Sequence, residues 1–247
     1  MSNHLSLRSG NPVLKANTFI KRQTTIDTGT MTITGTVNKT ALGLLLLMTT
    51  AIFTWNMAPT DPRMSALMMV GIFGGLIAAI ITVFKRHLAP YTTPIYALLE
   101  GLALGGISRF FETLYPGIVN QAVFLTFGTL AALLFAYQSG LIKPTENFKL
   151  GIVAATGGIF FVYIISFILG LFGVQVPLIH SNSNFGILFS FGVVVIAALN
   201  LVLDFDFIEE GAEIGAPKYM EWFGAFGLLV TLIWLYLQIL HLLAKLQ

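Results

Sequence analysis

Residues Leu199–Glu213 read LNLVLDFDFIEEGAE, an apolar run that passes into two aspartates and three glutamates. This run ends a longer apolar window, Asn184–Leu203. Crossing the hydrocarbon core of a bilayer takes roughly 20 mostly apolar residues as a helix, and the window is long enough. The carboxylates therefore lie at the edge of a predicted membrane-spanning helix, either as its solvated end or as functional groups.

The composition of the whole chain agrees with a membrane protein. Of 247 residues, 56% are hydrophobic and only 10% are charged, whereas soluble domains average about 25% charged residues. The net charge of +2 and the lack of a basic stripe argue against a nucleic-acid partner. The chain has no cysteine, which excludes disulfides, thiolate metal sites and a cysteine nucleophile.

Seven apolar windows are long enough to span a bilayer, and short connectors rich in Pro, Gly, Asn and charge separate them. They predict an all-α integral membrane protein, a seven-transmembrane-helix bundle within residues 39–247. The windows are Thr40–Met57, Met64–Phe84, Tyr91–Phe110, Ile118–Gln138, Phe148–Phe172, Asn184–Leu203 and Trp222–Leu243.

The distribution of lysine and arginine predicts the orientation, because short cytoplasmic loops collect these residues. With a cytoplasmic N-terminus, only Arg63, Arg109 and Lys245 fall outside. We therefore expect the N-terminus inside and, after seven spans, the C-terminus outside. Residues 1–38 are rich in threonine and glycine and have little to bury, so they are predicted to form a mobile cytoplasmic tail. The predicted cytoplasmic cations are Arg8, Lys15, Lys21, Arg22, Lys39, Lys85, Arg86, Lys143, Lys149 and Lys218.

Small residues recur at four-residue spacing in three of the windows. Such rows let membrane helices approach closely, and we expect them to pack helices within one bundle rather than to join two copies. The rows are Gly71, Gly75 and Ala79; Ala97, Gly101 and Gly105; and Ala154 and Gly158.

Glu100 is the most prominent ionisable residue within a predicted span. It lies in PIYALLEGLALGG, near the middle of the third window and beside a row of glycines. A carboxylate at the bilayer centre costs roughly 2.5–3.5 kcal/mol on insertion scales, so such residues are functional candidates. The functional interpretation is a proton acceptor, and the structural one is a protonated side chain bonded to a neighbouring helix.

Asp204 and Asp206 are the next candidates. Residues two apart on a helix differ by about 200°, so one of the two can face the bundle interior. Asn200 precedes Asp204 by one helical turn, which favours Asp204 as the inward residue and extends a polar track. If the helix ends early, Asp206 lies in the following loop.

Further acidic residues follow on the predicted cytoplasmic side. Glu209, Glu210 and Glu213 indicate either a solvated acidic loop or the mouth of a cation path, and Glu221 lies at its edge. Carboxylate oxygens suit Ca²⁺, but no EF-hand spacing occurs, so no high-affinity metal site is expected. The cations predicted to pair with these carboxylates are Lys85, Arg86 and Lys218.

No motif indicates an enzyme. The sequence lacks HExxH spacing, a phosphate-binding Gly-Lys-Thr loop and a Gly-x-Ser-x-Gly elbow. Non-enzymatic function without a cofactor is therefore the expectation.

Three strings carry a family resemblance: SGNPVLKANTF, YALLEGLALGGISRFFE and LNLVLDFDFIEEGAEIGAPKYMEWFGAFGLLVTLIWLYLQIL. Together they resemble the bacterial YccA/Bax inhibitor family of the transmembrane Bax inhibitor motif (TMBIM) superfamily, over essentially the whole chain. The resemblance implies a seven-helix bundle with its last helix near the centre. It also implies a pH-sensitive calcium leak channel in a bacterial inner membrane.

In that family an aspartate ending the sixth helix shares a proton with an aspartate in the seventh, which latches the pore. The first carries over to Asp204 or Asp206. The second does not, because the window Trp222–Leu243 contains no carboxylate. The matching position falls at Thr231 or Gln238. Either Glu221 or Glu100 replaces the missing partner, or this chain lacks such a latch.

Three functions remain open from the sequence. The first is a passive leak for Ca²⁺ or another cation, sensitive to protons. The second is a regulator that uses its tail to bind a membrane protease or another inner-membrane partner. The third is a proton-coupled transporter that uses Glu100.

Overall fold

The computed structural model describes residues 29–58, 60–173 and 183–247. These residues form seven long α-helices and one short 3-10 helix, η1 (Arg86–Leu88). In chain order, the long helices are α2 (Ile33–Trp55), α3 (Pro62–Phe84), α4 (Ala89–Leu114), α5 (Ile118–Gln138), α6 (Glu146–Leu171), α8 (Asn184–Glu213) and α9 (Met220–Lys245).

Each of the seven predicted windows is a helix, and six of the helices are long and apolar enough to cross a membrane. The exception is α4, whose first half is rich in Pro, Thr and Tyr. It packs against both α2 and α3, so neighbouring helices cover much of its surface. Polar residues are tolerated there because protein rather than lipid surrounds them.

Two predicted boundaries were wrong. The first helix begins at Ile33 rather than Thr40 because Thr32 caps it, accepting a hydrogen bond from the Gly35 amide. The end of the predicted tail 1–38 is therefore helical, while residues 1–28 lie outside the described residues. At the other boundary, α8 continues past Leu203 to Glu213. Asp206 and the three glutamates after it belong to this helix and not to a loop.

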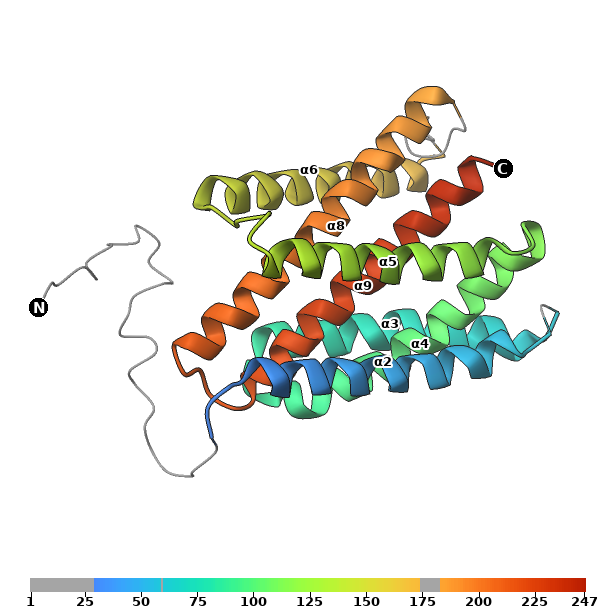
Figure 1. The fold of residues 1–247 in the computed structure, drawn as a ribbon. Coiled ribbons are helices and arrows are strands. Elements are labelled where there is room, and N and C mark those ends of the chain that lie inside the picture. The colour runs from blue at the N-terminus through green and yellow to red at the C-terminus, as the bar shows by residue number, and fades with distance from the viewer. Residues whose placement is uncertain (1–28, 59, 174–182) are drawn as a thin grey trace, which may run out of the picture.

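Figure 1 shows the long helices alternating in direction. Four of them, α2, α4, α6 and α9, begin at the end of the bundle where α3, α5 and α8 finish; we call this the N-terminal end of the bundle. At the opposite end lie the C-terminus and the start of α8. The tight αα connections of the chain, such as the turn through Gly117 with φ 89°, impose this antiparallel order.

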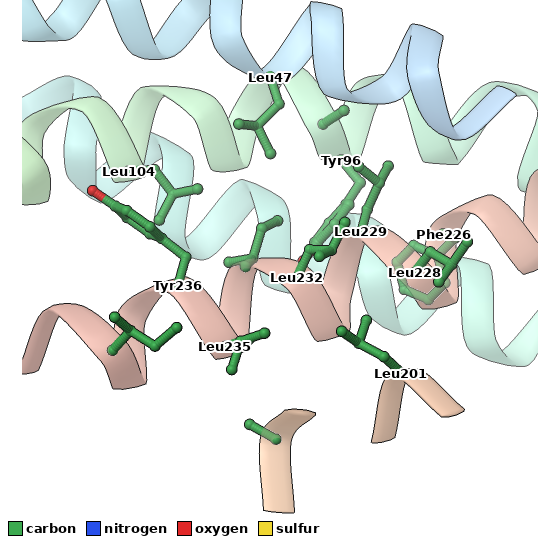
Figure 2. Packing of buried hydrophobic residues seen from close by; sticks show 14 of the residues in the cluster. Leu47, Tyr96, Leu104, Leu201, Phe226, Leu228, Leu229, Leu232, Leu235 and Tyr236 are labelled. Carbon is green, nitrogen blue, oxygen red and sulfur yellow. The ribbon is translucent and has the colours of Figure 1, made fainter. Parts of the chain in front are cut away.

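The centre of the bundle is α9, as the family resemblance implies. Among the described helices it has the largest set of buried residues, and it packs against α2, α4, α5 and α8. In Figure 2 its leucines, including Leu229 and Leu232, lie among residues of the surrounding helices such as Leu47, Leu104 and Leu201.

Small residues set the spacing of three neighbouring helices. A Cβ atom at Gly71 of α3 would lie 2.6 Å from the Leu99 carbonyl oxygen of α4, and one at Gly101 or Gly105 would overlap the backbone of α2. Two of the predicted rows therefore pack helices within the bundle. The prediction for the third row is wrong, because Gly158 of α6 has no neighbour within 4 Å of its Cβ position.

Candidate functional site

A cavity of about 680 Å³ lies between α3, α4, α8 and α9. Its polar lining comes from Tyr96 and Glu100 of α4, Asp204 of α8 and Thr231 of α9, and the remaining wall is apolar. We call it the acidic cavity. It brings together two of the carboxyl groups that the sequence singled out, although more than 100 residues of chain separate them.

Glu100, Asp204 and Thr231 lie at a similar depth in the bundle. Glu100 and Thr231 are each about three turns after the first residues of α4 and α9, and Asp204 is about two and a half turns before the end of α8. All three of these helix ends are at the N-terminal end of the bundle. The carboxyl groups therefore lie well inside a predicted hydrocarbon core rather than at its surface.

Asp204 packs against the central helix. It lines the acidic cavity together with Thr231 of α9, and its Oδ1 atom lies 3.4 Å from the Cβ position of Gly227. Oδ2 is buried and has no hydrogen-bond partner among the described residues. An unpartnered buried carboxyl oxygen is costly, which marks Asp204 as more than a structural residue.

Glu100 lies over a glycine of the neighbouring helix. A Cβ atom at Gly75 of α3 would be 2.6 Å from Glu100 Oε1, so the glycine makes room for the carboxyl group. In the described part of the chain, no group forms a hydrogen bond or ion pair with it. Glu100 therefore faces the glycine row of α3, whereas Gly101 and Gly105 of its own helix face α2; the structural interpretation, a bond to a neighbouring helix, is not seen.

Asp206 points away from the acidic cavity. Its Oδ2 atom lies 2.5 Å from Lys149 Nζ of α6, and its side chain is 22% exposed. The side chains of Asp204 and Asp206 therefore point in different directions, as their separation of about 200° around the helix requires. Asp204 lines the acidic cavity, and Asp206 lies at the surface. The ion pair with Lys149 was not predicted, because nothing in the sequence indicates which lysine α6 brings to this face of α8.

Asn200 and Gln238 both face α6 instead of the acidic cavity. Asn200 donates a hydrogen bond to Thr156 Oγ1 at 2.9 Å, and Gln238 accepts one from the Tyr163 hydroxyl at 3.1 Å. The predicted polar track from Asn200 to Asp204 is therefore wrong. Of the two candidate positions on the seventh helix, Thr231 and not Gln238 faces Asp204.

Glu221 is fully buried in a separate cluster. It accepts hydrogen bonds from the Thr32 amide at 2.9 Å and the Thr32 hydroxyl at 2.8 Å. It pairs with Lys218 at 2.8 Å and with Lys39. These four residues, the Glu221 cluster, join the starts of α2 and α9. Because its oxygens are all engaged there, Glu221 does not replace the missing partner of Asp204.

The predicted ion pairs of Lys85 and Arg86 are also wrong. The Arg86 guanidinium lies 5.2 Å from the centroid of the Phe223 ring, and in the described ranges neither residue forms an ion pair. Of the three predicted cations, Lys218 alone pairs with a described carboxylate. Within the same ranges, no group of three histidine or acidic side chains is arranged to hold a metal ion.

Comparison with known proteins identifies the chain at the level of its family. No curated protein and no solved structure matches it. The family described as Bax inhibitor 1 like matches residues 11–247, a range that includes every helix described above. The chain, an integral membrane protein by the length and apolarity of its helices, belongs to the Bax inhibitor 1 like family.

Proposed function

We propose that this protein is a passive, pH-sensitive leak channel for cations, with Ca²⁺ as the main ion, whose path passes through the acidic cavity. One observation carries the proposal: Glu100 and Asp204, from different helices, line the same cavity, and a buried oxygen of Asp204 has no partner among the described residues. Carboxylate oxygens are the ligands that Ca²⁺ prefers. A passing cation would supply the positive charge that no described side chain provides there.

Protons and cations would compete for these two carboxyl groups. Two charged carboxylates in one cavity repel each other, and protonation of either one relieves this repulsion. Protonation therefore favours a cavity empty of cations, and loss of protons favours water and cations in it. Leak should rise as the pH rises. Glu100 takes the role of second carboxyl group, since Thr231 occupies the facing position on α9.

The orientation that we propose places the N-terminal end of the bundle in the cytoplasm, with all seven long helices spanning a bacterial inner membrane. Lys85, Arg86, Lys143, Lys149 and Lys218 are at that end, and cytoplasmic loops favour such residues. A cytoplasmic N-terminal segment before α2 and a C-terminus outside complete the topology. Since the chain has no cysteine, single introduced cysteines tested with an impermeant thiol reagent would check each connector without background.

Calcium flux into proteoliposomes of purified protein tests the channel. We expect flux that rises from mildly acidic to mildly alkaline pH. Asp204→Asn and Glu100→Gln should each remove most of this pH response, because one titrating group is lost. Asp206→Asn is the matched control: it lies two residues along the same helix but faces Lys149, and it should retain the response.

Two outcomes would contradict the proposal. One is flux no greater than in empty liposomes while circular dichroism and gel filtration show folded protein. The other is an equal loss of pH response in Asp206→Asn and Asp204→Asn. Repeating the assay with and without a pH gradient separates a leak from a proton-coupled transporter, because only the transporter needs the gradient.

A second candidate function, regulation of a membrane protease or another inner-membrane partner, has one observation in its favour. Thr30 forms a β-bridge with Pro217, and Met31, which is 2% exposed, packs next to Gly211 and Gly224. A partner that pulls on the tail would therefore act directly on the turn between α8 and α9. Deletion of residues 1–28 should abolish that regulation and spare cation flux.

A further inference from the structure

A second large cavity opens at the N-terminal end of the bundle, on the other side of α9 from Glu100. It has a volume of about 650 Å³, and α2, α5, the connector after α5, and α8 form its walls. The wall residues between α2 and α5 are largely apolar, whereas the rim holds charged side chains. We call it the amphipathic cavity. The proposed cation path does not use it.

The length of the amphipathic cavity matches one leaflet of a bilayer. Its lining runs along α2 from Ile33, the first helical residue, to Leu44, a distance of about 16 Å at the rise of an α-helix. Half of a hydrocarbon core is about 15 Å. Leu130 and Leu228 line the same cavity from α5 and α9. An acyl chain entering from the N-terminal end would therefore lie in the cavity over its full leaflet depth.

The rim of the amphipathic cavity carries one charge of each sign that has no ion-pair partner. Lys143 and Glu209 both line it, and neither takes part in an ion pair in the described ranges. The Glu209 carboxylate accepts a hydrogen bond from the Tyr137 hydroxyl. This leaves oxygen lone pairs free for a further donor. Asp206, also on the rim, is paired with Lys149.

We propose that the amphipathic cavity is a binding site for a phospholipid with a primary ammonium headgroup, such as phosphatidylethanolamine. The acyl chain would occupy the apolar space between α2 and α5. The lipid phosphate would bind Lys143, and the ammonium group would donate hydrogen bonds to Glu209. A choline headgroup has no N–H donor, and an anionic headgroup has no ammonium group to offset the charge of Glu209, so both should bind less well.

A second groove in the same molecule serves as an internal control for this site. An apolar groove of about 230 Å³ shares Leu44 with the amphipathic cavity and continues along α2 toward the opposite end, past Trp55 and Tyr236. No charged side chain lines it. Any lipid acyl chain can cover such a groove, so headgroup preference should depend on the rim residues of the amphipathic cavity alone.

Native mass spectrometry of the full chain, released from micelles doped with equal amounts of phosphatidylethanolamine, phosphatidylcholine and phosphatidylglycerol, tests the site. We expect phosphatidylethanolamine to be retained preferentially. Glu209→Gln, which keeps an oxygen for Tyr137, should reduce that retention about tenfold, as loss of one charge-assisted hydrogen bond does. Lys143→Gln should lower the retention of all three lipids, because each presents a phosphate.

Glu146→Gln serves as the control, since this side chain is at the same end of the bundle, is 90% exposed and does not line the cavity. Its lipid retention should equal that of the parent. Soluble phosphoethanolamine should not displace the bound lipid, because it lacks the acyl chain. Equal retention of the three lipids, retention unchanged in Glu209→Gln, or displacement by phosphoethanolamine would each overturn the proposal.

Discussion

Two groups of acidic side chains lie in different parts of this bundle, and they differ in how many of their oxygens have hydrogen-bond or ion-pair partners. In the Glu221 cluster, one fully buried carboxylate is bound by two lysines and by both donors of Thr32. In the acidic cavity, Glu100 has no bonding partner among the described residues, and Asp204 has a buried oxygen without one. The first arrangement fastens two helices, whereas the second leaves carboxyl groups ready to take up a proton or a cation.

Each of these carboxyl groups lies beside a glycine of a neighbouring helix. Gly35 adjoins Glu221, Gly75 adjoins Glu100, and Gly227 adjoins Asp204. A glycine brings the helix axes close and leaves a space where a carboxyl group fits. The same packing device therefore serves both groups, and the number of hydrogen-bond donors around each acid makes the difference.

The largest effect on stability is expected for Glu221→Ala. It removes the partner of Lys39 and Lys218 and leaves the Thr32 amide unbonded. Breaking a buried ion pair costs about 3–5 kcal/mol, and we expect about 3 kcal/mol because the lysine side chains are 20% and 44% exposed. Chemical unfolding in detergent micelles measures the loss. Glu221→Gln should lie between the variant and the parent, and a loss below about 1 kcal/mol would show that the cluster does not fasten the helices.

The next largest effect on stability is expected as a difference between two glycine-to-alanine variants. In Gly35→Ala the new methyl group would overlap a carboxylate that four bonds hold in place, so we expect a loss of about 2 kcal/mol from overpacking. In Gly75→Ala the three heavy atoms nearest the new methyl group all belong to Glu100, whose side chain can rotate aside. Its stability should stay within about 0.5 kcal/mol of the parent, helped by alanine's helix propensity. Equal losses in the same unfolding assay would remove the proposed difference between the groups.

Asp204→Asn should change stability by less than about 1 kcal/mol, because Oδ2 has no hydrogen bond to lose and burial of the neutral amide costs less than burial of a charge. The same variant should lose most of the pH response of cation flux. Thermal unfolding and flux on one preparation test both statements together. A large loss of stability would assign Asp204 to the structural group with Glu221.

The smallest effect is expected for Asp206→Asn, at about 0.5 kcal/mol, since the ion pair with Lys149 is partly exposed and exposed pairs contribute little. Added salt should screen the pair and reduce the difference between variant and parent. A difference that salt leaves unchanged would indicate that Asp206 acts through another contact.

The helices of this protein were largely predictable because their signals are local. The window Ile118–Gln138 has the observed bounds, since apolar length alone defines it. Apolar length did not predict the helix ends correctly, because tertiary contacts also decide which residues there are helical. Thr32 extends α2 toward the N-terminus because it caps the helix and binds Glu221. The acidic end of α8 stays helical through Glu213, beside Tyr137 and Lys149.

The sequence predicted individual residues of the site but not which of them lie close together. Glu100 and Asp204 were found because charge within an apolar window is costly, and the 200° rule separated Asp204 from Asp206. The predicted polar track through Asn200 was wrong because residues four apart lie on only roughly the same face of a helix. Asn200 instead donates a hydrogen bond to Thr156 of α6. The sequence left Glu221 as a candidate partner for Asp204, but in the structure Glu221 binds Lys39 and Thr32 instead.

The sequence by itself determined that the chain forms apolar helices long enough to cross a membrane, where the ionisable residues fall along them, and which family the chain belongs to. These properties follow from short runs of neighbouring residues. The tertiary structure alone decided which carboxyl groups meet and which are neutralised by lysines. That outcome depends on the rotation and depth of each helix against α9, and these are fixed by packing between residues far apart in the chain.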